Sequence, residues 1–392
     1  MTRRADAPAR PGAHDPRGEC FQWLRHGQQA LEAILAAIAQ ARFSIRLETF
    51  IFQPDAIGNA FRDALLAARQ RGVRVQVMCD ALGSLPLPTS YWGELVAAGG
   101  EFRWFNPFQI HRFIYRDHRK IFVVDDQTAF IGGFNISTDY SGDGVGSGWR
   151  DLGLKISGPL AGELADAFDD LFGRADFRHK RLQRLRRSRL DAVHSGAGWK
   201  LLLTGPGRGH RELKQSLAHD FSGAKSIRII SAYFLPNLRL LRKLKQAARR
   251  GAKVQLILAG KSDVWLMRMA TRGLYAPLLG AGVEIYEYQP QILHAKVVIV
   301  DDIIYVGSAN LDPRSLGINY EVLARISSPA LAAEARQIFE GDLPHCQRID
   351  RQRFGRGRRL WDNIIARWAF VVLARLDPYF ARRQRRNHLS PP

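Results

Sequence analysis

Residues 118–135 read HRKIFVVDDQTAFIGGFN, and residues 294–310 read HAKVVIVDDIIYVGSAN. Each stretch holds the pattern H-x-K-x4-D, followed by a short hydrophobic run, a glycine turn and an asparagine, G-[GS]-x-N. Residues two apart on a strand point to the same face, so each His shares a face with its Lys. The hydrophobic runs IFVV and VVIV predict strands that enter the interior of a sheet. The chain therefore contains the same predicted site twice, each time next to a predicted strand.

The segments around these two motifs repeat in the same order. SIRLETFIF matches SIRIISAYF, QRGVRVQVM matches RRGAKVQLI, and AAGGEFRWFNP matches AGVEIYEYQP, at residues 44–52 and 226–234, 70–78 and 249–257, and 97–107 and 281–290. Ordered matches at a nearly constant separation are the signature of an internal repeat. The sequence therefore predicts a duplicated domain.

Each copy alternates helical and strand patterns. Helices are predicted at 28–41, 58–70 and 236–250, and strands at 44–52, 73–78 and 253–259. Such alternation indicates an α/β fold with a largely buried sheet. Between the copies, residues 174–189 are rich in Arg and Lys and predict an exposed linker or basic helix. We expect a flexible N-terminus (1–20), a first domain (21–173), a basic linker (174–197), a second domain (198–350) and a basic amphipathic tail (351–392).

The overall composition is globular and strongly basic. With 58 Lys and Arg against 37 Asp and Glu, the formal net charge is +21, so the expected partners are polyanions, either nucleic acid or an anionic membrane. The three widely spaced cysteines exclude a disulfide scaffold and suggest a reducing compartment. Neither a signal peptide nor a transmembrane helix is predicted, which suggests a protein that is soluble or lies on a membrane surface.

The residue types of the motif suit chemistry at phosphorus. Candidate ligands of the non-bridging phosphate oxygens are a lysine and an asparagine from each copy, Lys120, Asn135, Lys296 and Asn310. His118 and His294 suit nucleophilic attack or proton transfer. If the copies meet face to face, the two histidines lie on opposite sides of one phosphorus atom, as a two-step in-line displacement requires.

A histidine in such a role needs a partner for its second ring nitrogen. Asp151 lies 33 residues after His118 and Glu321 lies 27 residues after His294, each opening a strand-like run. We expect each carboxylate to orient the histidine of its own copy. Zinc is the competing interpretation of paired histidines, but HExxH, paired cysteines and a dense His/Asp cluster are missing, and two lysines would repel a dication. No metal or other cofactor is therefore expected.

With these motifs the sequence resembles the phospholipase D superfamily over residues 20–345. Within it, ETFIF (48–52), GVEIYEYQPQILHAKVVIVDD and GSANLDPRSLGINYE are most similar to the shorter bacterial cardiolipin synthases, which lack N-terminal transmembrane helices. The resemblance implies two phospholipase D-like domains, each a mixed sheet flanked by helices, packed with pseudo-twofold symmetry around one active site. It also adds Asp125 and Asp301 to the catalytic set, although both follow buried runs and a turn or salt-bridge role is favoured for them.

The implied reaction is phosphatidyl transfer through a phosphohistidine. One phosphatidylglycerol loses glycerol and a second supplies the attacking hydroxyl, with His118 as nucleophile and His294 as general acid and then base. Which histidine has which role stays open, because the copies are chemically alike. A phospholipase D-type hydrolase, a phosphodiesterase or a nuclease is the alternative function.

Three features favour lipid over nucleic acid. Residues 105–115 are apolar beside one motif, residues 264–279 could line a lipid channel or form a core helix, and the tail alternates apolar and Arg-rich stretches. Sequence-specific nucleic-acid motifs are not recognised. The expected partners are anionic phospholipids, the expected location is the cytoplasmic side of a bacterial cell membrane, as a peripheral protein, and the oligomeric state is left open.

Overall fold

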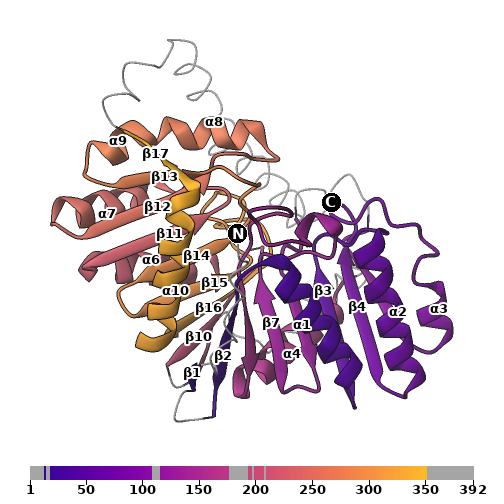
Figure 1. The fold of residues 1–392 in the computed structure, drawn as a ribbon. Coiled ribbons are helices and arrows are strands. Elements are labelled where there is room, and N and C mark those ends of the chain that lie inside the picture. Colours follow the sequence, from indigo (N-terminus) through magenta and orange to yellow (C-terminus); the bar gives the residue numbers. More distant parts are fainter. Residues whose placement is uncertain are drawn as a thin grey trace, which may run out of the picture.

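The computed structural model describes residues 13–14, 18–107, 115–175, 193–196, 198–206 and 209–350. Figure 1 shows two halves side by side, the first from indigo to magenta and the second from magenta to yellow. Most of the apolar segment 105–115, most of the basic linker and the whole of the tail 351–392 lie outside the described residues, so those three expectations stay predictions.

An eight-stranded mixed sheet forms the first half, in the order β1-β2-β8-β7-β6-β3-β4-β5. Strands β3, β4 and β5 are parallel, and the other neighbours are antiparallel. The strands are β1 (Ala13–His14), β2 (Cys20–Leu24), β3 (Ser44–Thr49), β4 (Arg74–Asp80), β5 (Glu101–Phe105), β6 (Ile121–Val124), β7 (Thr128–Gly132) and β8 (Gly153–Ser157).

A nine-stranded sheet forms the second half, in the order β17-β13-β12-β11-β14-β15-β16-β10-β9. Its strands are β9 (Val193–Gly196), β10 (Trp199–Thr204), β11 (Ser226–Ser231), β12 (Lys253–Ala259), β13 (Glu284–Tyr288), β14 (Lys296–Val300), β15 (Ile303–Gly307), β16 (Glu321–Ser327) and β17 (Cys346–Arg348). The run β10-β16-β15-β14-β11-β12-β13 repeats the first-half run β2-β8-β7-β6-β3-β4-β5 strand for strand. The predicted duplication is therefore confirmed at the level of topology.

Helices flank both sheets and also repeat. They are α1 (Gly27–Gln40), α2 (Ala56–Gln70), α3 (Gly93–Ala97), α4 (Pro159–Phe172), α6 (His210–Gly223), α7 (Leu238–Arg249), α8 (Trp265–Gly273), α9 (Tyr275–Leu279) and α10 (Pro329–Asp342). Asp55 and Asn237 cap the equivalent helices α2 and α7 by accepting backbone N–H groups of their first turns. The segment 264–279, expected as one helix or a channel lining, forms α8 and α9, and its Met267 and Leu278 are buried in the core.

One hydrophobic core joins the halves. Leu160 and Leu164 of α4 belong to the same buried cluster as Leu331 of α10 and Val306 of β15. The Trp23 indole N–H donates across the halves to the Leu331 carbonyl over 3.3 Å. Because this core is continuous, the two sheets hold a fixed relation, and residues from both can build one site. In the described part of the chain, no helix is both long enough and apolar enough to span a bilayer.

Candidate active site

Short backbone bridges between the halves bring the two motifs together. The His118 N–H donates to the Tyr320 carbonyl over 3.0 Å, and the Tyr320 N–H returns a bond to the Arg116 carbonyl over 2.9 Å. On the other side, the Arg150 N–H donates to the Ile292 carbonyl and the His294 N–H to the Arg150 carbonyl, each over 2.8 Å. The motif around His118 therefore lies beside the residue that precedes Glu321, and the motif around His294 lies beside the residue that precedes Asp151.

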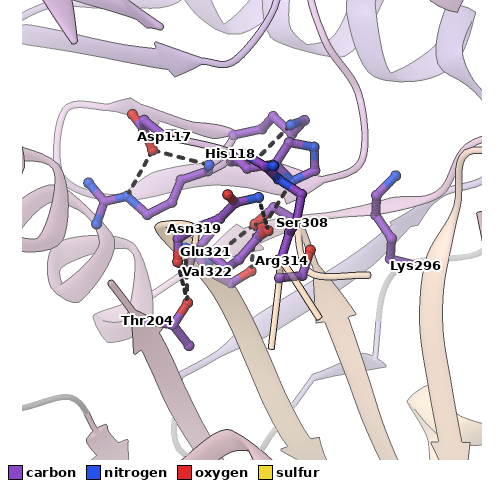
Figure 2. Close-up of polar contacts among 12 residues, drawn as sticks. Asp117, His118, Thr204, Lys296, Ser308, Arg314, Asn319, Glu321 and Val322 are labelled. Atoms are coloured by element: carbon purple, nitrogen blue, oxygen red, sulfur yellow. Dashed lines mark hydrogen bonds and ion pairs between the residues drawn. The ribbon is translucent and has the colours of Figure 1, made fainter. Parts of the chain in front are cut away.

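As a result, each histidine is held by a carboxylate of the other half. His118 Nδ1 lies 3.0 Å from Glu321 Oε2, and His294 Nδ1 lies 2.7 Å from Asp151 Oδ2. All four side chains are buried. Figure 2 shows His118 above Glu321, with Ser308 beside the carboxylate and Lys296 nearby. The expected partners are present, but the predicted pairing within each copy is wrong, because the contact is made across the interface between the halves.

The two carboxylates differ in length, and the glycine turns of the motifs match that difference. A Cβ at Gly133 would lie 2.3 Å from Asp151 Oδ1, so only glycine leaves room for the shorter acid. At the equivalent position of the second half, the Ser308 hydroxyl donates to Glu321 Oε2 over 2.5 Å. In both halves, the residue in the glycine turn therefore helps to fix a buried carboxylate against a histidine. Gly133 leaves space for Asp151, and Ser308 donates a hydrogen bond to Glu321.

A buried ion pair secures the bridge beside Asp151. Arg150, from the first half, makes a bond of 3.0 Å from Nε to Asp342 Oδ1 of α10 in the second half. Its backbone N–H and carbonyl meanwhile form the bridge to residues 292–294. Because Arg150 contacts the second half through both side chain and backbone, the segment that carries Asp151 is held in place against His294.

Two lysines place positive charge beside the histidines. Lys120 Nζ donates to the His118 carbonyl over 2.9 Å, and Lys296 Nζ donates to the His294 carbonyl and lies 2.9 Å from His294 Nδ1. Burial and the neighbouring Lys296 lower the pKa of Lys120 to about 7. Burial lowers the pKa of Lys296 to about 8, although Asp151 and Glu321 oppose that shift. A negative group between the two ammonium groups would relieve this penalty, which suits a phosphodiester.

The pKa values of both histidines are lowered, which favours the neutral imidazole. Burial lowers the pKa of His118, with Glu321 opposing the shift. Burial and Lys296 lower the pKa of His294 to about 4, with Asp151 opposing. Because Nδ1 of each ring faces a carboxylate, we assign the ring proton to Nδ1, which leaves Nε2 for chemistry.

The two asparagines of the motifs differ in their surroundings. Asn135 is fully buried; its Oδ1 accepts the Ile51 N–H over 3.1 Å, and its Nδ2 donates to the Tyr140 hydroxyl over 2.6 Å. Asn310 is also buried, and its Oδ1 makes no hydrogen bond within the described part of the chain. Asn135 therefore positions Tyr140 and the segment after β3, and phosphate binding by either amide stays a prediction.

Tyr140 is a site residue that the motif analysis missed. Its hydroxyl lies 3.5 Å from His294 Nε2, and its ring meets the His294 ring edge to face, with 5.3 Å between centroids. Trp149 lies against the same imidazole, with 5.5 Å between centroids. His118 instead meets Phe50, with 5.2 Å between centroids. Alignment of the two copies offers a signal for it, because Tyr140 and Ser315 lie the same number of residues after Asn135 and Asn310 and differ in side chain.

Asp125 and Asp301 lie at the far ends of the motif strands. Asp125 accepts the Arg42, Phe43 and Ser44 N–H groups over 2.9, 2.7 and 2.9 Å. Asp301 likewise accepts the Ser226 N–H over 2.8 Å. At ~3.3 Å per residue, the five residues from Lys120 place Asp125 about 16 Å from the lysine. Their inclusion in the catalytic set is therefore wrong, and the turn role is the one that the structure supports.

We expect Asp125→Ala to lower stability without changing the chemistry. Three backbone N–H groups lose their acceptor, at a cost of about 1–3 kcal/mol. Thermal unfolding should show a lower midpoint, while kcat per folded molecule stays within about twofold of the wild type. Asp63→Ala, at an exposed site on α2, is the matched control. A large drop in kcat with an unchanged midpoint would return Asp125 to the catalytic set.

Comparisons with known proteins agree with this architecture. A family model described as "Cardiolipin synthase, PLD-like domain" matches residues 34–174 and 217–343, one stretch in each half. Cardiolipin synthase B of Salmonella typhimurium is 34% identical over 359 residues, covering 88% of this chain and 86% of that protein. Cardiolipin synthase 2 of Bacillus anthracis is 35% identical over 350 residues, covering 87% of this chain and 68% of that protein.

Solved structures show the same fold at lower identity. The phosphatidylserine synthase of Haemophilus influenzae superimposes with a TM-score of 0.71 at 16% identity, covering 92% of this chain and 94% of that one. The polyphosphate kinase of Porphyromonas gingivalis gives a TM-score of 0.57 at 15% identity, covering 85% of this chain and 49% of that one. The family match in both halves, together with relatives about one-third identical along nearly the whole chain, shows that this chain belongs to the cardiolipin synthase family of PLD-like domain proteins.

Proposed function

We propose that this protein is a phosphatidyltransferase of the cardiolipin synthase type, which moves a phosphatidyl group from one phosphatidylglycerol to a hydroxyl of a second. The observation that carries the proposal is the crossed pair of buried histidine–carboxylate contacts, with a lysine of lowered pKa beside each histidine. Family membership supplies the lipid substrate class. A site with two imidazoles and two ammonium groups suits a two-step displacement at an anionic phosphodiester.

In the first step, His118 Nε2 attacks phosphorus and the bond from phosphorus to the glycerol oxygen breaks. The leaving oxygen takes a proton from His294 Nε2, so free glycerol departs and a phosphohistidine remains. Bound phosphodiester opposes the effect of burial and Lys296 and raises the pKa of His294, which makes the imidazolium available at the moment it is needed. Asp151, held on Nδ1, stabilises that imidazolium.

In the second step, the roles of the proton donor and acceptor reverse. His294 Nε2 takes the proton from a hydroxyl of the second phosphatidylglycerol, whose oxygen attacks phosphorus. The bond between phosphorus and His118 Nε2 breaks, and cardiolipin leaves. Lys120 and Lys296 offset the charge that develops on the non-bridging oxygens in both steps.

The different neighbours of the two rings support His118 as the nucleophile. The Tyr140 oxygen accepts a hydrogen bond from Asn135, and the same hydroxyl lies 3.5 Å from His294 Nε2, to which it can donate its own proton. In the described part of the chain, the corresponding nitrogen of His118 makes no such hydrogen bond, and the aromatic neighbour of the ring is the apolar Phe50. A nitrogen with a free lone pair is the better nucleophile, whereas a nitrogen that already shares a proton with a hydroxyl suits acid–base work.

We expect the purified protein to convert phosphatidylglycerol vesicles into cardiolipin and free glycerol in equal amounts. Product analysis by thin-layer chromatography and mass spectrometry tests this, with and without EDTA. Activity should survive the chelator, because ammonium groups rather than a metal ion hold the phosphate in this mechanism. Phosphatidic acid as the sole product would assign the protein as a hydrolase. DNA cleavage without lipid turnover would favour the nuclease alternative, and inhibition by EDTA that added metal reverses would contradict the metal-independent mechanism.

The proposed location is the cytoplasmic face of the cell membrane, as a peripheral protein. The proposed partners are anionic phospholipids, which supply both substrates. The net charge of +21 supports this placement, because a basic protein accumulates at a surface rich in phosphatidylglycerol.

A further inference from the structure

In the part of the chain that the structure describes, large apolar side chains are exposed at few places, and most of them follow the carboxyl ends of parallel strands. Within the described residues, six large hydrophobic side chains are exposed: Phe43 74%, Leu85 68%, Val96 50%, Leu238 55%, Val264 39% and Trp265 58%. Four of them, Leu85, Leu238, Val264 and Trp265, follow the carboxyl ends of the parallel strands β4, β11 and β12. Phe43 and Val96 precede β3 and β5 and therefore lie at the opposite edge. We name the four residues the rim patch.

The rim patch draws on equivalent positions of the two halves. Ser44 of β3 pairs with Arg74 of β4, and Ser226 of β11 pairs with Lys253 of β12. Leu85 lies as many residues after Arg74 as Val264 lies after Lys253, so the two positions are equivalent. The duplicated fold thus exposes an apolar side chain at matching points of both halves, which one isolated surface residue would not explain.

In the first half, the patch adjoins His118. Ser84, the neighbour of Leu85, donates from its hydroxyl to the Phe50 carbonyl over 3.1 Å and accepts the Phe52 N–H over 2.9 Å. The Phe50 ring lies against the His118 imidazole. Leu85 is therefore connected to the first catalytic histidine through one buried serine and one aromatic ring.

In the second half, the patch adjoins His294. Asp263, the neighbour of Val264, accepts the Tyr233 hydroxyl over 2.6 Å. The next residue before Tyr233, Ala232, donates its N–H to the Ala295 carbonyl over 3.1 Å, directly after His294. Val264 is therefore connected to the second catalytic histidine through Asp263, Tyr233 and one backbone hydrogen bond.

Trp265 begins a helix whose other face is part of the core. Met267 and Ala270 of α8 are buried in the second-half cluster, whereas Trp265 is 58% exposed at the helix start. Lys261 is exposed in the loop before the helix, and Arg239 is exposed beside Leu238 at the start of α7. Tryptophan and aliphatic side chains next to basic groups are typical of surfaces that enter the headgroup region of an anionic bilayer. Figure 1 shows α8 at the top of the second half, next to α9.

We propose that the rim patch docks the protein on an anionic phospholipid bilayer, with the active site facing the headgroups. This inference rests on the proposed function, because a phosphodiester that stays in the membrane can be reached only if the site opens toward the membrane. Charge complementarity selects this partner, since a chain of net charge +21 is drawn to anionic lipid. The exposed apolar residues favour lipid over nucleic acid as the partner, because a bilayer buries apolar side chains and a phosphate backbone does not.

The test compares two sets of serine substitutions in the full-length protein. The rim variant carries Leu85→Ser, Val264→Ser and Trp265→Ser, and the control variant carries Phe43→Ser and Val96→Ser at the opposite edge. Co-sedimentation uses vesicles of phosphatidylglycerol and of phosphatidylcholine, and turnover of the soluble diester bis(4-nitrophenyl) phosphate reports on the site itself. We expect the rim variant to bind phosphatidylglycerol vesicles at least tenfold more weakly, and the control variant and all soluble-diester rates to match the wild type within about twofold.

A second measurement tests the proposal if the serine substitutions cause the rim variant to misfold. Vesicles with brominated acyl chains quench tryptophan fluorescence at the membrane, and the difference between wild type and Trp265→Phe isolates the contribution of Trp265. We expect that contribution to be quenched. Unchanged vesicle binding by an active rim variant, or an unquenched Trp265, would overturn the proposal, as would a rim variant whose only change is the loss of a dimer in sedimentation equilibrium. Wild-type protein that binds vesicles through the rim patch and makes no cardiolipin would instead refute the proposed function alone.

Discussion

Replacement of either active-site histidine by alanine is expected to lower cardiolipin formation by roughly 10⁴-fold or more, since catalytic groups that act as a unit show losses of this size. His118 and His294 are buried and each is held by a carboxylate of the opposite half, so the two imidazoles act as a fixed pair. His219→Ala, at an exposed position on α6, should leave the rate unchanged. The measurement is initial cardiolipin formation from phosphatidylglycerol vesicles at matched protein concentration.

The two histidine variants should differ in the intermediate that they accumulate. With a 4-nitrophenyl phosphodiester, whose leaving group needs no proton, His294→Ala retains the attack by His118 but lacks the base for the second step. It should release a burst of nitrophenolate and trap a phosphohistidine at residue 118, detectable as an acid-labile adduct by mass spectrometry. His118→Ala should show neither the burst nor the adduct. An adduct on His294 would reverse the two roles while leaving the two-step mechanism intact.

Lys120→Met is expected to remove most activity and at the same time to stabilise the protein. The variant loses one of two ammonium groups that offset charge on the phosphate oxygens, a loss comparable to removing an oxyanion donor, about 10²–10³-fold in kcat. It also removes a charge whose burial costs stability, because burial and Lys296 lower the pKa of Lys120 to about 7. A residue kept for function at the expense of stability should behave in this way.

The pKa shift of Lys120 also predicts how the difference in stability between Lys120→Met and the wild type changes with pH. The pKa of Lys120 is about 7 in the folded protein and ~10.4 in the unfolded chain. Between those values the unfolded chain binds the proton more tightly, so wild-type stability gains from this group as pH rises. Lys120→Met should therefore have a midpoint several degrees above the wild type near pH 7, and the difference should shrink toward pH 10. Lys253→Met, at an exposed position, is the control. A variant that is less stable than the wild type at pH 7 would show that Lys120 stabilises the fold.

Substrate binding should show the complementary dependence. An anionic phosphodiester raises the lysine pKa values, so its affinity is greatest when Lys120 and Lys296 are both protonated. Affinity is therefore expected to weaken as pH rises above about 8, where the free enzyme loses those protons.

Much of the fold was predictable because duplication and periodicity are local properties. The predicted helix 28–41 corresponds to α1, and the predicted strand 253–259 coincides with β12. The predicted strand 44–52 ends at Thr49, because the chain then turns to pair Phe52 with Ile136 beside the site. Such an end depends on a partner that lies 84 residues away, so no local pattern could report it.

For the active site, the sequence by itself identified the two histidines, the two lysines and their carboxylates, but not Tyr140. The spacing of H-x-K on a strand places both side chains on one face, and the repeat predicts that this happens twice. Which carboxylate serves which histidine was decided only by the tertiary structure. His118 contacts Glu321 and His294 contacts Asp151 because the bridges at Tyr320 and Arg150 run between the halves. Asp125, although it belongs to the motif, caps a turn at the far end of its strand. The physical reason is that strand geometry is set by neighbours in the chain, whereas contacts between segments far apart in the sequence depend on how the sheets and their turns pack.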